Sequence, residues 1–214
     1  MYVIGYPESQ TRWLAYLLAY CLNTQYSDLD STHNLSKDED LKSYLQGNLV
    51  HPSYQAQLGK IIRTHSISIS QQDKTPIVYV VRDGRDVMLS YYYRQQSSPS
   101  KDNPHIPQKT FTSKVYRKLG LKQLSTSLEL SPFSRFLHHH LSEWVSHVNT
   151  WLNHQPTAII RYEDLLSIPE ETLASLMMRL GVEVSSEIIQ QGVKIFNSEY
   201  LSKYWTLDKK QLLA

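Results

Sequence analysis

The chain has 214 residues, of which 41% are hydrophobic and 20% charged, so global disorder is excluded and one packed domain over residues 1–214 is expected. Lysine and arginine number 22 against 20 aspartates and glutamates, and the resulting net charge of +2 argues against a nucleic-acid partner. The one cysteine, Cys21, excludes an internal disulfide and fits a reducing compartment.

Neither a leader nor a membrane span is predicted from the apolar segments. The longest apolar run, residues 13–22, is shorter than the ~20 residues that cross a bilayer. No basic region precedes an apolar stretch at the N-terminus, so no signal peptide is expected. We therefore expect a cytoplasmic protein without a membrane span, and the sequence does not indicate its oligomeric state.

Segments of strand composition alternate with segments of helical spacing along the chain. The predicted strands are 2–5, 60–64, 77–81 and 157–161. The predicted helices are 10–22, 36–46, 86–94, 132–153, 169–181 and 185–195. This alternation predicts a three-layer α/β fold with a mainly parallel central sheet flanked by helices. Residues of about 95–140 are predicted to form a mobile segment on the acceptor side, a lid.

Polar residues follow the first predicted strand, where parallel sheets bind their ligands. The joint from Tyr6 to Trp13 leads into a helix N-terminus, whose N–H groups and dipole favour phosphate or sulfate. Hydroxyl groups of Ser9 and Thr11 and the guanidinium of Arg12 would add donors. The alternative is an ordinary turn in which Ser9 serves only as the helix N-cap.

Two further strand ends contain candidate site residues. Arg82 follows the third strand and, with Ser90 on the next helix, is placed to hold a second phosphate; the alternative is surface pairing with nearby aspartates. His65 follows the second strand, where an imidazole can act as a general base near neutral pH. Arg63 lies on the same side of that strand and would stabilise developing negative charge. A lone histidine is more often structural, but the place of His65 beside two candidate anion loops favours a functional role.

Five motifs, in order, resemble those of the cytosolic-type sulfotransferase family. The family's Tyr-Pro-Lys-Ser-Gly-Thr-Thr-Trp loop corresponds to residues 6–13, and its Lys-Thr-His to residues 63–65. Its Arg-Asn-Pro-Lys-Asp-Val-x-x-Ser-Tyr-Tyr corresponds to residues 82–92. Its Trp-x-x-His-Val-x-x-Trp corresponds to residues 144–151, and its Tyr-Glu-Asp-Leu to residues 162–165.

The resemblance implies a P-loop NTPase-like sulfotransferase fold and the co-substrate 3′-phosphoadenosine-5′-phosphosulfate (PAPS), with no metal. His65 would deprotonate a hydroxyl or amine of a small-molecule, carbohydrate or lipid acceptor, which attacks sulfur in line. Arg63 and Arg12 complete the implied catalytic set, because fixed cations stabilise charge on the leaving group. The residues implied to bind the co-substrate are Ser9, Gln10, Thr11, Arg12, Trp13, Arg82, Ser90 and Tyr162.

The sequence departs from the family at both ends of the expected nucleotide site. Glu8 stands in place of the loop lysine, and a carboxylate ~4 Å from a phosphosulfate would cost on the order of 4 kcal/mol. Gln10 replaces a glycine, and the family's late Arg-Lys-Gly segment is absent. The alternative is therefore a sulfotransferase-like protein that binds nucleotide, ligand or a protein partner without turnover. A kinase on a related fold is disfavoured because the first loop lacks Gly-Lys-Ser/Thr.

Three consecutive histidines, residues 138–140, suggest a metal site at first sight. Successive side chains on a helix point about 100° apart, so these imidazoles are expected to diverge. No metal site is predicted there.

Overall fold

The structure is a computed structural model that describes residues 1–30, 59–67, 69, 75–97 and 131–197. It divides into two compact units, one made of residues 1–83 and 146–214 and the other of residues 84–145. The helix predicted at 36–46, residues 98–130 of the predicted lid, and the C-terminal residues 198–214 lie outside the described part.

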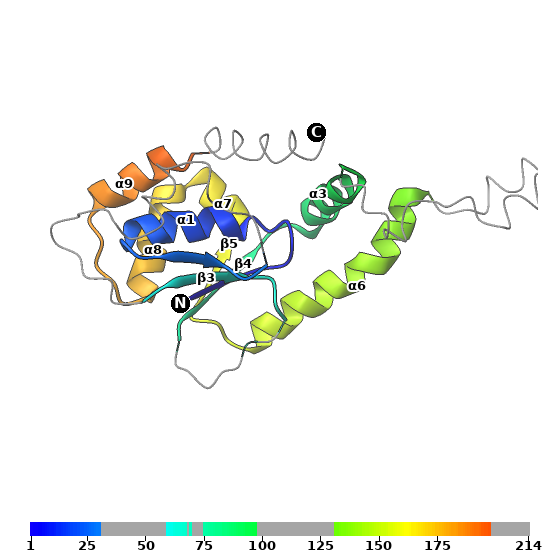
Figure 1. Cartoon of the computed structure of the whole chain (residues 1–214), viewed down its shortest axis with the longest axis horizontal. Coiled ribbons are helices and arrows are strands. Elements are labelled where there is room, and N and C mark those ends of the chain that lie inside the picture. The colour runs from blue at the N-terminus through cyan, green and yellow to red at the C-terminus, as the bar shows by residue number, and fades with distance from the viewer. Residues whose placement is uncertain (31–58, 68, 70–74, 98–130, 198–214) are drawn as a thin grey trace, which may run out of the picture. The chain divides into compact units, whose positions relative to one another are not determined.

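A five-stranded parallel sheet in the order β2-β3-β1-β4-β5 forms the centre of the first unit (Figure 1). Its strands are β1 Tyr2–Ile4, β2 Tyr26–Asp28, β3 Ile61–Thr64, β4 Ile77–Val81 and β5 Ala158–Arg161. In the middle of the sheet Val3 lies opposite Arg63 on one side and Val78 on the other. Because all the pairs are parallel, every strand ends at the same edge of the sheet.

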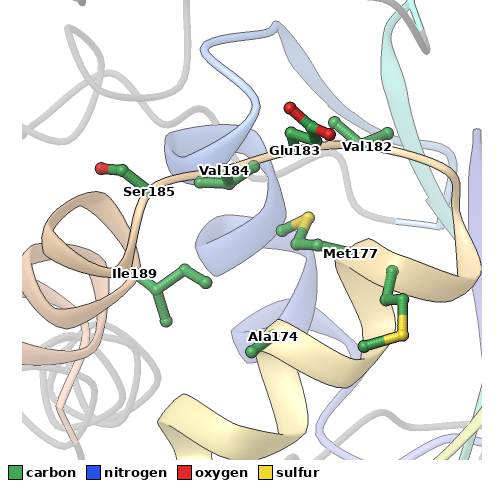
Figure 2. A pocket seen from close by; sticks show the side chains of 8 residues that line it. Ala174, Met177, Val182, Glu183, Val184, Ser185 and Ile189 are labelled. Atoms are coloured by element: carbon green, nitrogen blue, oxygen red, sulfur yellow. The ribbon is translucent and has the colours of Figure 1, made fainter.

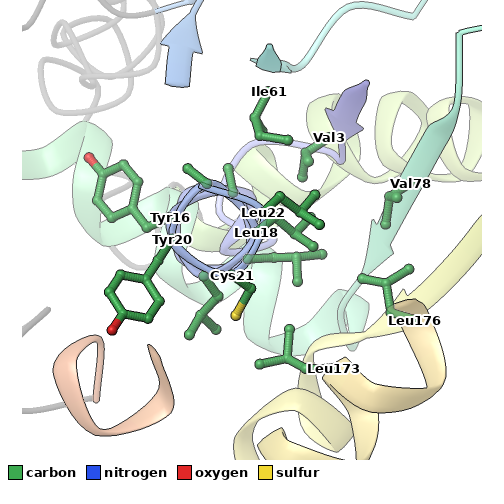
Figure 3. Packing of buried hydrophobic residues seen from close by; sticks show 14 of the residues in the cluster. Val3, Tyr16, Leu18, Tyr20, Cys21, Leu22, Ile61, Val78, Leu173 and Leu176 are labelled. Atoms are coloured by element: carbon green, nitrogen blue, oxygen red, sulfur yellow. The ribbon is translucent and has the colours of Figure 1, made fainter. Parts of the chain in front are cut away.

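Helix α1, Thr11–Cys21, packs in the middle of the larger core. Ten of its eleven residues are buried, as expected for a helix that is covered on all sides. Figure 3 views the core along this helix, with Val3 and Val78 of the sheet on one side and Leu173 of α8 nearby. The helices that share this core are α7 Tyr162–Ser167, α8 Pro169–Arg179 and α9 Ser186–Ile195.

The opposite face of the sheet is covered by the end of α6, Pro132–Asn153. Neighbouring strand residues point to opposite faces, so Ile4 and Tyr79 face away from α1 and pack on Trp151. The rings of Tyr79 and Trp151 stack with their centroids 6.3 Å apart. Helices therefore lie on both faces of the sheet, which confirms the three-layer α/β prediction.

The second unit contains α3, Gly84–Ser97, and the first part of α6. Tyr91 and Tyr92 of α3 contact Phe136 of α6 edge-on, at 5.5 and 5.3 Å between ring centroids. A Cβ added to Gly84 would stand 2.8 Å from the indole of Trp144, so glycine is needed for this close approach. The tyrosines thus pack helix against helix in this unit.

Most element boundaries lie within two residues of their predicted positions, and α6 matches its predicted bounds. Two short elements, β2 and α7, were not predicted. No helix of the described ranges combines the length and hydropathy that a membrane crossing requires.

Candidate active site

The loop after β1 depends on one glycine and two residues with left-handed backbones. A Cβ on Gly5 would stand 2.7 Å from both the carbonyl oxygen of Val80 and a methyl group of Thr11, so no other residue fits. Glu8 and Gln10 have φ of 69° and 63°, a conformation that costs L-residues about 1 to 2 kcal/mol. The Gln10 that replaces the family glycine therefore keeps a glycine-like conformation under strain.

The N-terminus of α1 opens from this loop without a side-chain cap. Its N-cap residue is Gln10, and no side chain accepts a hydrogen bond there, so the alternative role of Ser9 as N-cap is wrong. Gln10 in the left-handed conformation followed by helical Thr11 turns successive N–H groups toward one side, an arrangement that binds anions. The positive end of the helix dipole adds to this preference.

Arg82 lies against the same loop. Its Nη1 donates a hydrogen bond to the carbonyl oxygen of Glu8 at 2.9 Å, and its guanidinium carbon is 4.8 Å from the ring centre of Tyr162. Its Nε is buried and has no hydrogen-bond partner among the described residues. A buried N–H without a partner costs about 1 to 3 kcal/mol, which a bound anion would recover.

Residues after β5 hold the end of β4 in place. Oε1 of Glu163 accepts a hydrogen bond from the backbone N–H of Asp83 at 2.8 Å. Tyr162 and Glu163 of the Tyr-Glu-Asp motif therefore contact Arg82 and its neighbour directly. The motif fixes the Arg82 side chain over the first loop.

Trp13 is buried rather than open to a ligand. It is 6% exposed, and its indole N–H donates to the carbonyl oxygen of Phe196 at 2.6 Å. Its ring meets that of Tyr162 edge-on at 6.0 Å. Of the two residues expected to contact adenine, Tyr162 is the more accessible.

Arg63 is buried at the end of β3, donates hydrogen bonds to three described side chains, and pairs with Asp30 at 3.9 Å. Its Nε donates to the hydroxyl of Thr11 at 3.0 Å, its Nη1 to Oδ1 of Asp28 at 2.5 Å, and its Nη2 to Nε2 of His65 at 2.6 Å. The side chains of Arg63 and Asp28 are 7% and 11% exposed. Burial alone would raise the pKa of Asp28, but the hydrogen bond and charge of Arg63 outweigh it and lower that pKa.

The partners of His65 settle which of its ring nitrogens carries the proton. Nδ1 lies 2.5 Å from the carbonyl oxygen of Gly5, which only accepts, so Nδ1 is protonated and donates. Nε2 faces the guanidinium of Arg63, which only donates, so Nε2 is unprotonated. Burial, and next the charge of Arg63, lower the pKa of His65 to about 4.

The backbone of His65 is held as firmly as its ring. Its N–H donates to Oδ2 of Asp30, and its carbonyl oxygen accepts from Nε2 of His147 at 3.1 Å. His147 Nδ1 in turn accepts from the hydroxyl of Tyr79 at 3.0 Å. Trp151 donates to the next carbonyl, that of Ser66. The Trp-x-x-His-Val-x-x-Trp motif thus fixes the chain just after β3.

Most of the site residues predicted from the sequence therefore lie at one edge of the sheet. The loop from Ser9 to Arg12, Arg63 with His65, and Arg82 with Tyr162 follow β1, β3, β4 and β5. Ser90 lies on α3, in the second unit. Asp28 was not identified from the sequence. Its signal was weak, because it ends the three-residue strand Tyr-Ser-Asp.

Two of the three consecutive histidines do converge, contrary to prediction. His139, His140 and Glu143 offer ligand-type atoms within 4.8 Å of one another on α6. Nδ1 of His140 lies 2.7 Å from Oε2 of Glu143. The prediction that the rings diverge is wrong for these two, because Glu143 lies one helical turn further along α6 and both imidazoles contact its carboxylate.

A separate apolar hollow of about 500 Å³ lies between α8 and α9 (Figure 2). Met177 and Ile189 point into it, and Met178 on its rim is 79% exposed. It shares no residue with the edge of the sheet described above.

Comparisons with known proteins agree with this architecture. The family profile described as the sulfotransferase domain matches residues 1–214, and the chain belongs to that family. No curated protein sequence matches the chain.

Several solved structures have a fold similar to that of this chain. Mouse sulfotransferase SULT7A1, solved with PAP, has a TM-score of 0.56 at 19% identity over 94% of this chain and 64% of its own. Retinol dehydratase, solved with androsterone and the inactive cofactor PAP, has a TM-score of 0.51 at 19% identity over 93% and 64%. The chain thus spans a little under two thirds of the length of both.

Proposed function

We propose that this chain transfers a sulfuryl group from 3′-phosphoadenosine-5′-phosphosulfate to a hydroxyl or amine of an acceptor. The observation that carries the proposal is the position of Arg82. Its guanidinium bonds the loop at Glu8, rests on Tyr162 and keeps a buried Nε without a partner among the described residues. A fixed cation beside an uncapped helix N-terminus fits a nucleotide phosphate.

In this proposal the residues from Ser9 to Arg12 hold the 5′ end of the nucleotide through backbone N–H groups, hydroxyls and a guanidinium. Arg82 and Ser90 bind the 3′-phosphate. Tyr162 contacts the adenine, and Trp13 supports Tyr162 from the core. Arg12, whose Nη2 lies 3.6 Å from Oδ2 of Asp28, is the nearest replacement for the missing loop lysine.

The proposed step is an in-line displacement at sulfur. An acceptor oxygen forms a bond to sulfur while the bond from sulfur to the 5′-phosphate oxygen breaks, releasing adenosine 3′,5′-bisphosphate. The proton of the acceptor passes to Nε2 of His65, the ring nitrogen that is unprotonated. Arg63 and Arg12 stabilise the negative charge that builds on the leaving oxygen.

A small-molecule acceptor is the class we favour. One relative in fold is named for retinol and was solved with retinol in one structure and with androsterone in another. A screen with radiolabelled co-substrate should compare phenols, sterols, sugars and lipids. Sulfuryl transfer lost in His65→Ala but kept in His138→Ala, an exposed histidine of α6, would support the proposal. Absence of transfer to every class would contradict it.

Two observations favour a second function, nucleotide binding without turnover. Glu8 replaces the cation of the loop, and Nε2 of His65 is already occupied by Arg63. In that case adenosine 3′,5′-bisphosphate would bind while no acceptor is sulfated.

A further inference from the structure

Nε2 of His65, the atom required as base, is occupied in this structure. Arg63 donates to it at 2.6 Å and cannot accept a proton in return. A lone pair engaged in this way cannot take a proton from an acceptor. The proposed reaction therefore requires Arg63 to move first.

The position of Arg63 is set by Asp28. Oδ1 of Asp28 accepts from Nη1, and Oδ2 accepts from the hydroxyl of Tyr26 at 3.0 Å, which fixes the carboxylate. Both ionic side chains are almost fully buried, and buried pairs of this kind keep a defined geometry. The planar guanidinium therefore points Nη2 at His65.

An anion at the start of α1 would lie next to this guanidinium. Nε of Arg63 is bonded to the hydroxyl of Thr11, the first residue of α1. An anion would add charge–charge attraction to its hydrogen bond with the guanidinium, which a neutral imidazole cannot offer. A phosphosulfate at the helix N-terminus would therefore compete with neutral His65 for Nη2.

We infer that Asp28 and Arg63 are positioning residues that keep His65 capped until an anion binds at the N-terminus of α1 and draws the Nη2 arm away. The inference rests on the proposed function and adds an order of events to it: nucleotide first, base second. A base that opens only in the loaded site is protected from idle proton exchange.

Charged side chains from several elements lie near His65 and influence its titration. Arg63 comes from β3, Asp28 from β2, and Asp30 from the residues just after β2. Arg12 of α1 faces Asp28, and His147 of α6 meets only the backbone carbonyl of His65. Arg63 is the one described cation bonded to the ring.

The test is a titration of ¹⁵N-labelled histidine by NMR, with the His65 signals assigned by their loss in His65→Gln. Unliganded wild type should show the Nδ1–H tautomer and a pKa near 4, well below the ordinary 6.5. Arg63→Met should shift that pKa upward toward 6.5, whereas Arg12→Met, which leaves the His65 contact intact, should not. The double variant Asp28→Asn/Arg63→Met leaves no buried unpaired charge and should shift the pKa in the same direction even if Arg63→Met fails to fold.

Adenosine 3′,5′-bisphosphate is the probe for the release step, with its binding followed by calorimetry on the same sample. Bound nucleotide should raise the pKa of His65 in wild type and have little further effect in the Asp28→Asn/Arg63→Met variant. An ordinary pKa of His65 in the unliganded wild type would contradict the inference that Arg63 occupies Nε2 of His65. Binding that leaves the His65 signals unchanged would overturn the release. Absence of binding would refute both the release and the proposed nucleotide site; the upward shift in Arg63→Met would then be the separate test of the Arg63 contact, because burial also lowers the pKa of His65.

Discussion

Arg82 and Glu8, 74 positions apart in the chain, are joined by a hydrogen bond of 2.9 Å from the guanidinium to a backbone carbonyl. The bond uses the main chain of Glu8, so it does not depend on the residue that replaced the family lysine. The end of β4 and the loop after β1 are therefore joined at the same edge of the sheet, whatever side chain stands at position 8.

Replacing Arg82 by alanine should weaken nucleotide binding strongly. A hydrogen bond to a charged group contributes about 1.5 to 3 kcal/mol, so a loss of roughly 10- to 100-fold in affinity is expected. The matched control is Arg179→Ala, since Arg179 is exposed in the last turn of α8, away from this edge of the sheet. A thermal shift with adenosine 3′,5′-bisphosphate that disappears in Arg82→Ala alone is the expected result. Equal shifts in both variants would remove Arg82 from the site.

Replacing Glu8 by lysine should tighten nucleotide binding or raise turnover, because a cation then stands where a carboxylate was. Glu8→Gln removes the negative charge without adding a positive one and should have a smaller effect in the same direction. Affinity from calorimetry and initial rates with labelled co-substrate are the two readouts. A decrease in both for Glu8→Lys would mean that the carboxylate has a role of its own.

Wild-type stability should fall as the pH drops from about 6.5 to about 4. Unfolded His65 takes up a proton near 6.5, whereas the folded pKa is about 4, so the unfolded state binds more protons across this window. The free energy of unfolding should decrease by up to about 1.4 kcal/mol per pH unit.

Urea denaturation at several pH values measures this slope. His147 also has a pKa lowered by burial, so part of the slope should remain when His65 alone is removed. His65→Gln should flatten the slope relative to wild type. An identical slope in His65→Gln would show that its ring titrates normally in the folded chain.

Replacing Gly5 by alanine should destabilise the first unit. The added methyl would stand 2.7 Å from the backbone oxygen of Val80, which cannot move aside cheaply. Overpacking of this kind costs about 1 to 3 kcal/mol. Gly192→Ala is the comparison, because its Cβ would meet side-chain atoms only, of Tyr20 at 3.1 Å and Cys21 at 3.3 Å, and alanine is the better helix former, so a smaller loss is expected. Denaturant midpoints that shift equally in the two variants would contradict this account.

Periodicity and composition were sufficient for the long elements, because α1 and β4 are largely buried and α6 carries its apolar residues at helical spacing. The strand β2 was not predicted, because its three residues include a serine and an aspartate and are too few to show the composition or alternation of a strand. It is stabilised by pairing with β3, a long-range contact that local sequence does not reveal.

The candidate site was predictable as a set of strand-end residues but not in its hydrogen bonds. Position alone made His65 a candidate base, yet the capping of its Nε2 depends on Arg63 and on Asp28 from an unpredicted strand. Trp13 was expected to meet a ligand but is buried, because its indole N–H bonds a carbonyl 183 positions away. Such partners are set by tertiary packing.

We propose that the edge of the sheet beside Arg82 binds a nucleoside bisphosphate. Isothermal titration of the wild-type chain with adenosine 3′,5′-bisphosphate, with adenosine 5′-monophosphate as the comparison ligand, tests it most directly. We predict saturable binding of one bisphosphate per chain and at least about tenfold weaker binding of the monophosphate, which lacks the 3′-phosphate that Arg82 would hold. No heat of binding, or equal affinity for the two nucleotides, would contradict the claim.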